Sequence, residues 1–397
     1  MKYKINAKSI VFYSGLWLYL FFSALTHSVI GQHDFFSSGI QVGRYIGLML
    51  LVVNMMSGKI RKNFFLECLI GIAIGVVVFL SMDSLLPITI MLVIYGTRRS
   101  DEKDIIKIYY LSTGVVILLS TVLSQIGLID DKIFIRTATG LKRHSMGMQY
   151  STVWAAFVFF LICTYIYYKK KLNIWHVIVV LAIDYYLYKM TDAILEAVLI
   201  ILIALIPWLY PVINKKNTFI SFFLKYSLAL SCVIAFIVEL LYIKYPDKLF
   251  RLDVLLSKRL SITANVIKQN GFHLFGKRFF MQGFGTWNFD WSLGYNYVDS
   301  FYINYTLQFG IIYMVFIIAL FTKICVDLYS NEQYYLLTLF SLSSIHGIFI
   351  SSIFLPQCNP FFMILFAEWT RLSIQPKLVR KKRSEHRTLQ SSGMHYL

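Results

Sequence analysis

Twelve long apolar stretches follow one another along this chain, and they constrain its fold more than any other feature. An apolar stretch of about 20 residues spans a bilayer as a helix, because a helix satisfies its backbone hydrogen bonds internally. The chain is 58% hydrophobic and 15% charged, which excludes a soluble enzyme, since so much apolar surface would aggregate in water. We therefore expect an all-α polytopic integral membrane protein. The expected membrane helices cover 8–28, 39–57, 64–81, 85–96, 105–125, 150–168, 174–190, 193–212, 219–243, 299–322, 334–350 and 359–372.

The basic residues predict how these helices are oriented. Short loops on the cytoplasmic side of a membrane are rich in Lys and Arg, and the short loops fit this rule when both termini are cytoplasmic. The fourth and twelfth stretches are short, so we expect them to be tilted beneath their neighbours or re-entrant. The expected regions are 1–243 with nine helices and an outer loop at 126–149, a large extracytoplasmic loop at 244–298, the last three helices at 299–372, and a basic cytoplasmic tail at 373–397.

Other partners are excluded by the pattern of charges and cysteines. The net charge of +18 is scattered in short clusters between apolar runs, which argues against a nucleic-acid partner. The five cysteines have no spacing typical of a zinc site or a disulfide framework. We therefore expect neither a metal nor another cofactor.

Residues 248–268 have the periodicity of an amphipathic helix that lies at the membrane surface. Arg259 borders its apolar face, where a cation normally has a partner. Its planar guanidinium either binds phosphate in an outward-open cavity or reaches the lipid headgroups. Lys258 lies on the opposite, solvated face, and we count it with Arg136 and Lys142 among the candidate substrate-binding residues. The expected apolar face consists of Leu249, Leu252, Leu256, Leu260 and Ile267.

A second basic cluster precedes the sixth apolar stretch. Ser145 and Gly147 predict a tight turn there, and the amides that begin the following helix would favour an anion. The alternatives are solvated charges and attraction to anionic lipid headgroups. The cluster consists of Arg136, Lys142, Arg143 and His144.

Residues 275–310 are rich in aromatic side chains, among them Trp287. They form either an interfacial aromatic belt or a surface that stacks on sugar rings. Asp299 begins the tenth expected helix, where it either caps that helix or serves as a general base for a hydroxyl nucleophile. Tyr302 and Asn304 follow it and are candidate substrate-binding residues.

Two further features have a functional and a structural interpretation. Residues 271–278 nearly match a phosphate-binding loop, but Arg278 stands where Ser or Thr is required; we count Arg278 among the outer basic residues that bind substrate. His346 is either a proton-relay residue or bonded to a hydroxyl such as Ser343 or Ser344.

Internal ion pairs are expected among Asp184, Lys189, Asp192 and Glu196.

In four segments the chain resembles the Wzy-type polysaccharide polymerases, membrane enzymes of capsule, exopolysaccharide and O-antigen assembly that are distantly related to O-antigen ligases. Their order around a large outer loop is also that of the family. Two positions differ from the family pattern: Asp299 is followed by Ser300 instead of Asn, and Thr191 and Asp192 are followed by no arginine. The segments are RHSMGMQYSTVWA (143–155), LSKRL (256–260) with HLFGKR (273–278), YVDSFYINYTLQFGIIY (297–313) and HGIFISSIFLPQCNPFFMIL (346–365).

The resemblance implies glycosyl transfer on the outer face of a bacterial plasma membrane. The growing glycan would pass from undecaprenyl pyrophosphate to a hydroxyl of the next lipid-linked repeat unit, without a metal. Arg143 and Arg259 would stabilise the pyrophosphate leaving group, and Asp299, or failing that His144, would activate the acceptor. Expected partners are both lipid-linked oligosaccharides, the bilayer, a chain-length regulator and a flippase. The alternatives are a polysaccharide ligase and a flippase or secondary transporter.

Overall fold

The computed structural model of the chain describes residues 7–57, 62–98, 100–136, 140–169, 172–213, 218–286, 289–292 and 294–367. The regular secondary structure of these residues is helical, apart from one short hairpin of β1 (Ile133–Ile135) and β2 (Lys142–His144), and the described residues of 271–300 form neither helix nor strand. The 3-10 helices are η1 (Ile30–Gln32), η2 (Ser351–Phe354) and η3 (Pro360–Phe366). The α-helices are α1 (Ala7–Leu25), α2 (Asp34–Met56), α3 (Lys62–Met82), α4 (Leu86–Gly96), α5 (Glu102–Gln125), α6 (Ser151–Lys169), α7 (Ile174–Thr191), α8 (Ile194–Ile213), α9 (Thr218–Lys244), α10 (Pro246–Leu255), α11 (Arg259–Asn270), α12 (Phe301–Ser330) and α13 (Tyr334–His346).

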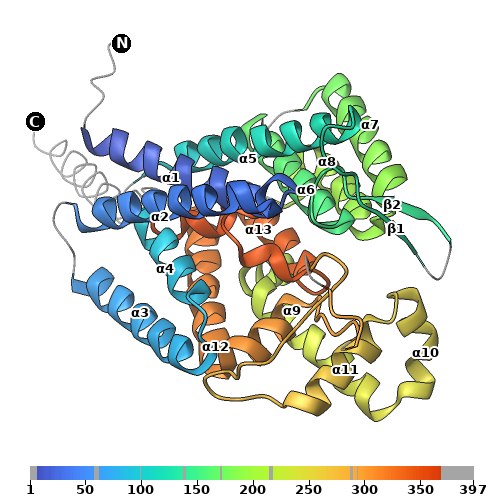
Figure 1. Cartoon of the computed structure of the whole chain (residues 1–397). Coiled ribbons are helices and arrows are strands. Elements are labelled where there is room, and N and C mark those ends of the chain that lie inside the picture. Colours follow the sequence, from blue (N-terminus) through green and yellow to red (C-terminus); the bar gives the residue numbers. More distant parts are fainter. Residues whose placement is uncertain are drawn as a thin grey trace, which may run out of the picture.

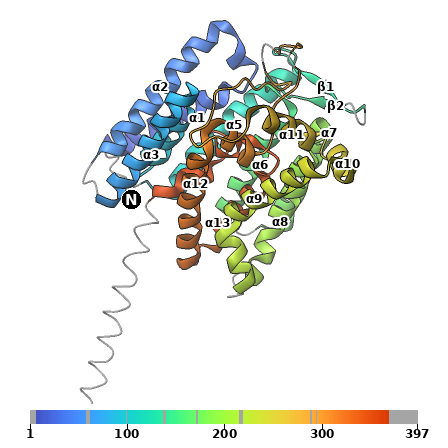
Figure 2. The same ribbon diagram turned by 90° about the horizontal axis from the view of Figure 1, so that it is seen from below.

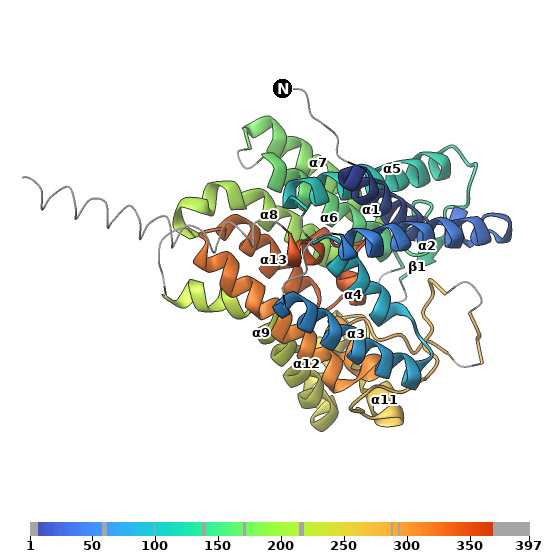
Figure 3. The ribbon, with the colours of Figure 1, turned by 90° about the vertical axis from the view of Figure 1, so that its left-hand side faces the viewer.

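The long apolar helices pack side by side as a bundle (Figure 1). Seen from below, α12 and α13 lie between α1–α3 on one side and α7–α10 on the other (Figure 2). Figure 3 shows α12 between α9 and α3, both of which it contacts. Large apolar side chains such as Phe35 and Leu80 are exposed on the outside of the bundle, as lipid contact requires.

Six helices of the described chain are long and apolar enough to cross a membrane, namely α2, α3, α5, α6, α9 and α12. The apolar segments Ser9–Leu25, Leu86–Gly96 and Ile194–Ile206 are shorter. The structure therefore agrees with the prediction of a multi-pass α-helical membrane protein. It does not show all twelve expected spans, because only six helices of the described chain are long and apolar enough. With 11 residues, α4 is about 16 Å long, roughly half the apolar thickness of a bilayer.

The segments that connect the helices gather at two ends of the bundle. At one end, which we call the hairpin end, the Val29 amide donates to the Gly147 carbonyl at 2.9 Å, and the Tyr297 hydroxyl lies 2.7 Å from Ser351 Oγ. At the opposite end, the Tyr13 hydroxyl donates to Asp104 at 2.7 Å. The hairpin end thus contains the loops that the basic residues place outside.

The twelfth expected helix is not an α-helix in the structure. Its described part forms η3, and the preceding segment 347–359 is mostly irregular. Nearly all of these residues are buried inside the bundle, where the Thr97 hydroxyl donates to the Met363 carbonyl at 2.6 Å. Irregular backbone is tolerated at membrane depth only where protein encloses it. Residues 373–397 lie outside the described chain.

The amphipathic segment 248–268 forms two helices instead of the one expected. Ser257 and Lys258 both have a positive φ, of 59° and 62°, so α10 ends before them and α11 begins directly after. The chain therefore reverses its direction between Leu256 and Arg259, and α10 and α11 contact each other and α9. Figure 1 shows both helices at the same end of the bundle as the hairpin.

Candidate functional site

An ion pair between Arg259 and Asp299 lies at the centre of the hairpin end. Arg259 is the first residue of α11, Asp299 lies two residues before α12, and Nε of the arginine is 2.7 Å from Oδ2 of the aspartate. The side chains are 27% and 22% exposed, so both remain accessible. The predicted partner of Arg259 is thus a carboxylate, and the N-cap position of α12 is taken by Ser300 instead of Asp299.

The β-hairpin brings two more arginines to the same end. Arg136 contacts Asp192 Oδ2 at 2.6 Å and Ser257 Oγ at 2.7 Å, so it joins the α7–α8 junction to the α10–α11 junction. Nε of Arg143 donates to the Thr191 carbonyl at 2.7 Å, and its guanidinium lies 5.7 Å from the centre of the Tyr150 ring. The expected tight turn after the hairpin is present, with the Met148 amide 3.0 Å from the Ser145 carbonyl.

A buried pair of ionisable residues links α8 to α13. Nε2 of His346 lies 3.3 Å from Oε1 of Glu196, and the two side chains are 0% and 3% exposed. Of the two alternatives for His346, the bond to Ser343 or Ser344 is not formed, because these hydroxyls donate to carbonyls of their own helix and Nδ1 of His346 has no hydrogen-bond partner in the described chain. His346 is therefore packed inside the bundle instead of lining a surface.

Asp299 is influenced by charges from several elements. Burial raises the pKa of its carboxyl above the ordinary value, while Arg259 and Arg143 act in the opposite direction and Glu196 adds to the rise. These residues come from four separate segments. The hairpin, α8 and α11 thus each bring a charged side chain near the carboxyl that precedes α12.

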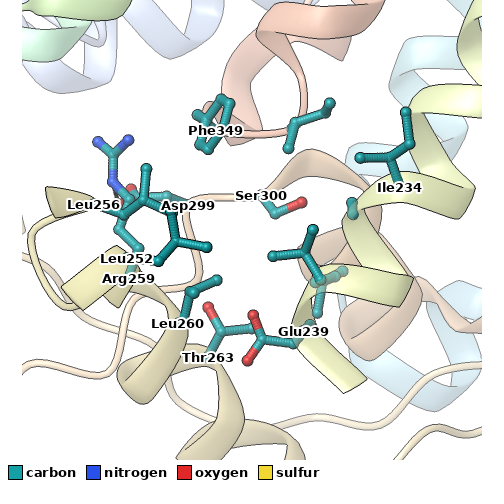
Figure 4. A pocket seen from close by; sticks show the side chains of 14 residues that line it. Ile234, Glu239, Leu252, Leu256, Arg259, Leu260, Thr263, Asp299, Ser300 and Phe349 are labelled. Carbon is teal, nitrogen blue, oxygen red and sulfur yellow. Dashed lines mark ion pairs between the residues drawn. The ribbon is translucent and has the colours of Figure 1, made fainter. Parts of the chain in front are cut away.

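A cavity of about 210 Å³ adjoins the Arg259–Asp299 pair. Figure 4 shows it between α9, α11 and the chain that enters α12, with Glu239 and Thr263 on the side away from Phe349. Most of its lining is apolar. The residues that line it are Ile234, Ala235, Val238, Glu239, Leu252, Leu256, Arg259, Leu260, Thr263, Asp299, Ser300, Ile303, Ile348 and Phe349.

Several basic residues predicted for the site lie beside it or away from it. Nδ1 of His144 is 2.6 Å from Asp131 Oδ2, an arrangement that fixes the hairpin. Lys142 and Lys258 are exposed, and Lys258 serves as N-cap residue of α11. Arg278 pairs with Asp83 at 3.2 Å between the outer loop and α3, with both side chains largely exposed.

The two predicted binding residues of α12 both donate hydrogen bonds to backbone carbonyls. The buried Tyr302 hydroxyl donates to the Ser344 carbonyl at 2.8 Å. The amide nitrogen of Asn304, also buried, donates to the Val298 carbonyl at 2.6 Å, which holds the turn before α12. Both residues therefore shape the segment that carries Asp299. Trp287 lies outside the described residues.

Three further residues contribute to the site, although the sequence does not mark them as site residues. Thr191 and Asp192 hold the two hairpin arginines, and Glu196 holds His346. Asp192 and Glu196 therefore do not form the ion pairs expected within this region. Asp192 pairs with Arg136 and Glu196 pairs with His346, both from distant segments of the chain. The signal for them was three polar residues in an otherwise apolar region.

The described residues contain no group of three His, Cys, Asp or Glu side chains placed to hold a metal ion. In comparisons with protein-family models, with curated proteins and with solved structures, nothing matches this chain. The structure therefore assigns the chain to the multi-pass membrane proteins, with a polar site at one end of the helix bundle.

Proposed function

We propose that this protein is a polymerase of lipid-linked oligosaccharide repeat units. It transfers a glycan from undecaprenyl pyrophosphate to a hydroxyl of the next lipid-linked unit at the outer face of a bacterial plasma membrane. The observation that carries the proposal is the convergence of Arg143, Arg259 and Asp299 at the hairpin end, beside a mostly apolar cavity. The site thus offers cations and a carboxylate to a substrate held in the membrane.

The arginines suit a pyrophosphate leaving group. Arg143 is held by a backbone carbonyl, and among the described residues no carboxylate lies within ion-pair distance of its guanidinium. Its charge is therefore available to an anion, and a planar guanidinium binds phosphate oxygens in pairs. When charge develops on the leaving oxygen, such a group stabilises it without a metal.

Asp299 suits the role of general base. Its carboxyl is partly exposed and held by Arg259, and burial raises its pKa, which brings it nearer to neutral pH, where a base is most effective. The acceptor hydroxyl would transfer its proton to Asp299 as the bond to the anomeric carbon forms and the bond to pyrophosphate breaks.

The test is deletion of the gene from the cells that carry it. Loss of long glycan, with single lipid-linked repeat units accumulating on the outer leaflet, is the expected result. The wild-type chain should restore long glycan, whereas a variant with both Arg143→Gln and Arg259→Gln should not. Arg251→Gln, an exposed arginine on α10, is the matched control.

Other outcomes of the same deletion exclude the proposal. Single units trapped on the inner leaflet would indicate a flippase. Long lipid-linked glycan that accumulates without transfer to its final acceptor would indicate a ligase. Long glycan made at the normal level by the double variant, with the protein inserted normally, would contradict the role of the two arginines.

A further inference from the structure

The cavity beside the Arg259–Asp299 pair has unused hydrogen-bonding capacity. Glu239, on α9, and Ser300, at the start of α12, both line it. Glu239 is 3% exposed and Ser300 is 9% exposed. Within the described chain, Oε1 of Glu239 and Oγ of Ser300 have no hydrogen-bond partner. A buried polar atom without a partner is costly to the fold. Two such atoms at one cavity indicate a ligand that supplies the missing bonds.

The lining defines the chemistry of that ligand. A lipid tail would fill the apolar part and leave both oxygens unpaired. An anion is disfavoured, because the carboxyl of Glu239 lines the cavity. A neutral ring with several hydroxyls satisfies the oxygens through its edge, while its less polar face packs against apolar side chains such as Phe349.

The size of the cavity limits the ligand to one small unit. Pockets for drug-sized molecules have volumes of roughly 300–1,000 Å³, and this one has about 210 Å³. Because Asp299 lines the same cavity, a hydroxyl on the ring that occupies it lies close to the carboxyl proposed as base.

We propose that the cavity binds one neutral sugar ring of the acceptor, with one ring hydroxyl bonded to Glu239 and another to Ser300. The inference rests on the proposed function, because it assigns one of the two substrates to a place in the site. Glu239 and Ser300 bind and orient the acceptor, and the cations at Arg143 and Arg259 remain on the side of the donor pyrophosphate.

Direct binding measurements test the proposal. The probe is the lipid-linked repeat unit extracted from deletion cells, titrated against the purified chain in lipid nanodiscs. We expect Ser300→Ala to weaken binding about tenfold, since one hydrogen bond to a buried group is lost. Glu239→Leu should weaken it at least as much, whereas Glu239→Gln should stay within about threefold, because its amide oxygen still accepts a hydroxyl.

Two controls separate binding from folding. Asp247→Asn changes an exposed carboxylate on α10 and should leave the affinity unchanged. The Tm of Glu239→Leu should equal or exceed that of the wild type, because leucine removes an unpaired buried oxygen from an apolar environment. A Tm that falls in step with the affinity would show that Glu239 is structural and would overturn the assignment.

The outcomes distinguish this inference from the proposed function. Equal affinities of wild type and variants would overturn the cavity assignment and leave the polymerase intact. If the purified wild-type chain binds no repeat unit and the deletion strain still makes long glycan, both the cavity assignment and the proposed function are overturned.

Discussion

Arg259 and Arg143 are held in different ways, and this difference predicts how each residue acts. Arg259 forms an ion pair with a carboxylate at 2.7 Å, so it must share its charge between Asp299 and a bound phosphate. Arg143 is anchored only through its Nε by a carbonyl, which leaves the terminal nitrogens of its guanidinium to an anion. If the protein acts as proposed, we therefore expect Arg143 to supply most of the positive charge and Arg259 mainly to position the aspartate.

Replacing either arginine with lysine should separate charge from geometry. Lysine retains the charge and loses the planar pair of donors. If Arg143 binds phosphate through both terminal nitrogens, Arg143→Lys should lower kcat/KM on the order of 100-fold, as measured by glycan synthesis in nanodiscs. Full activity of Arg259→Lys would instead show that the charge of Arg259 beside Asp299 is sufficient and that its planar guanidinium is not needed.

The pH profile should report Asp299. Because burial raises its pKa, the carboxyl stays protonated up to a higher pH than an ordinary aspartate, and kcat/KM should fall as the pH drops through that raised value. Arg259→Gln removes the charge that favours the carboxylate, so the acid limb of its profile should lie at higher pH than in the wild type. An acid limb that does not move would exclude Asp299 as the base.

The sequence predicts that Arg259 has a partner, but it does not predict the partners of the two hairpin arginines. Arg259 was expected to have a partner because it borders an apolar face, and the structure supplies Asp299. The partners of Arg136 and Arg143 lie at the α7–α8 junction, far away in the sequence. No local pattern encodes such a pairing, since it depends on how the hairpin folds back over the bundle.

Among the elements, α12 is interrupted where the outer loop meets it. Gly310 has a φ of 92° within the helix, and the Ile311 amide donates to the His273 carbonyl at 3.0 Å. A Cβ on Gly310 would lie 2.3 Å from the Gly276 amide nitrogen, and one on Gly276 would lie 1.9 Å from the Gln308 carbonyl oxygen. The segment that resembled a phosphate-binding loop thus docks into a break in α12.

Gly310→Ala should disrupt this docking. Both the backbone clash and the positive φ oppose a side chain, so we expect a loss of about 1–3 kcal/mol of stability and a marked loss of activity. Thermal unfolding in detergent and glycan synthesis measure the two effects. Gly39→Ala is the control, since its Cβ would meet nothing within 4 Å; equal effects of both variants would refute the docking role.

Apolar runs in the sequence predict most of the long helices, but they do not predict where the backbone turns. The 3.6-residue periodicity over 248–268 continues through Ser257 and Lys258, although both have a positive φ. Hydrophobic periodicity reports which side chains share a face, and it does not detect a reversal when apolar residues on both sides pack into the same cluster. Leu256 and Leu260 do so, next to Tyr242 of α9.

Over the whole molecule, the proposed function requires the hairpin end to face the outside of the cell. The five cysteines are buried, so single introduced cysteines can report the topology. In intact cells, a membrane-impermeant maleimide should label Leu128→Cys, at the hairpin end, and not Gln333→Cys, between α12 and α13. Both positions are exposed. Labelling of Gln333→Cys alone would invert the topology and contradict the proposed function.

The irregular segment 347–366 has a consequence for biogenesis. Its backbone lacks the continuous internal bonds of an α-helix, so it is costly to transfer alone from the translocon into lipid. The helices that enclose it, among them α4 and α5, precede it in the chain and are synthesised first. These helices can therefore already be in the membrane when this segment leaves the ribosome. The order of synthesis thus matches the order in which the bundle can assemble.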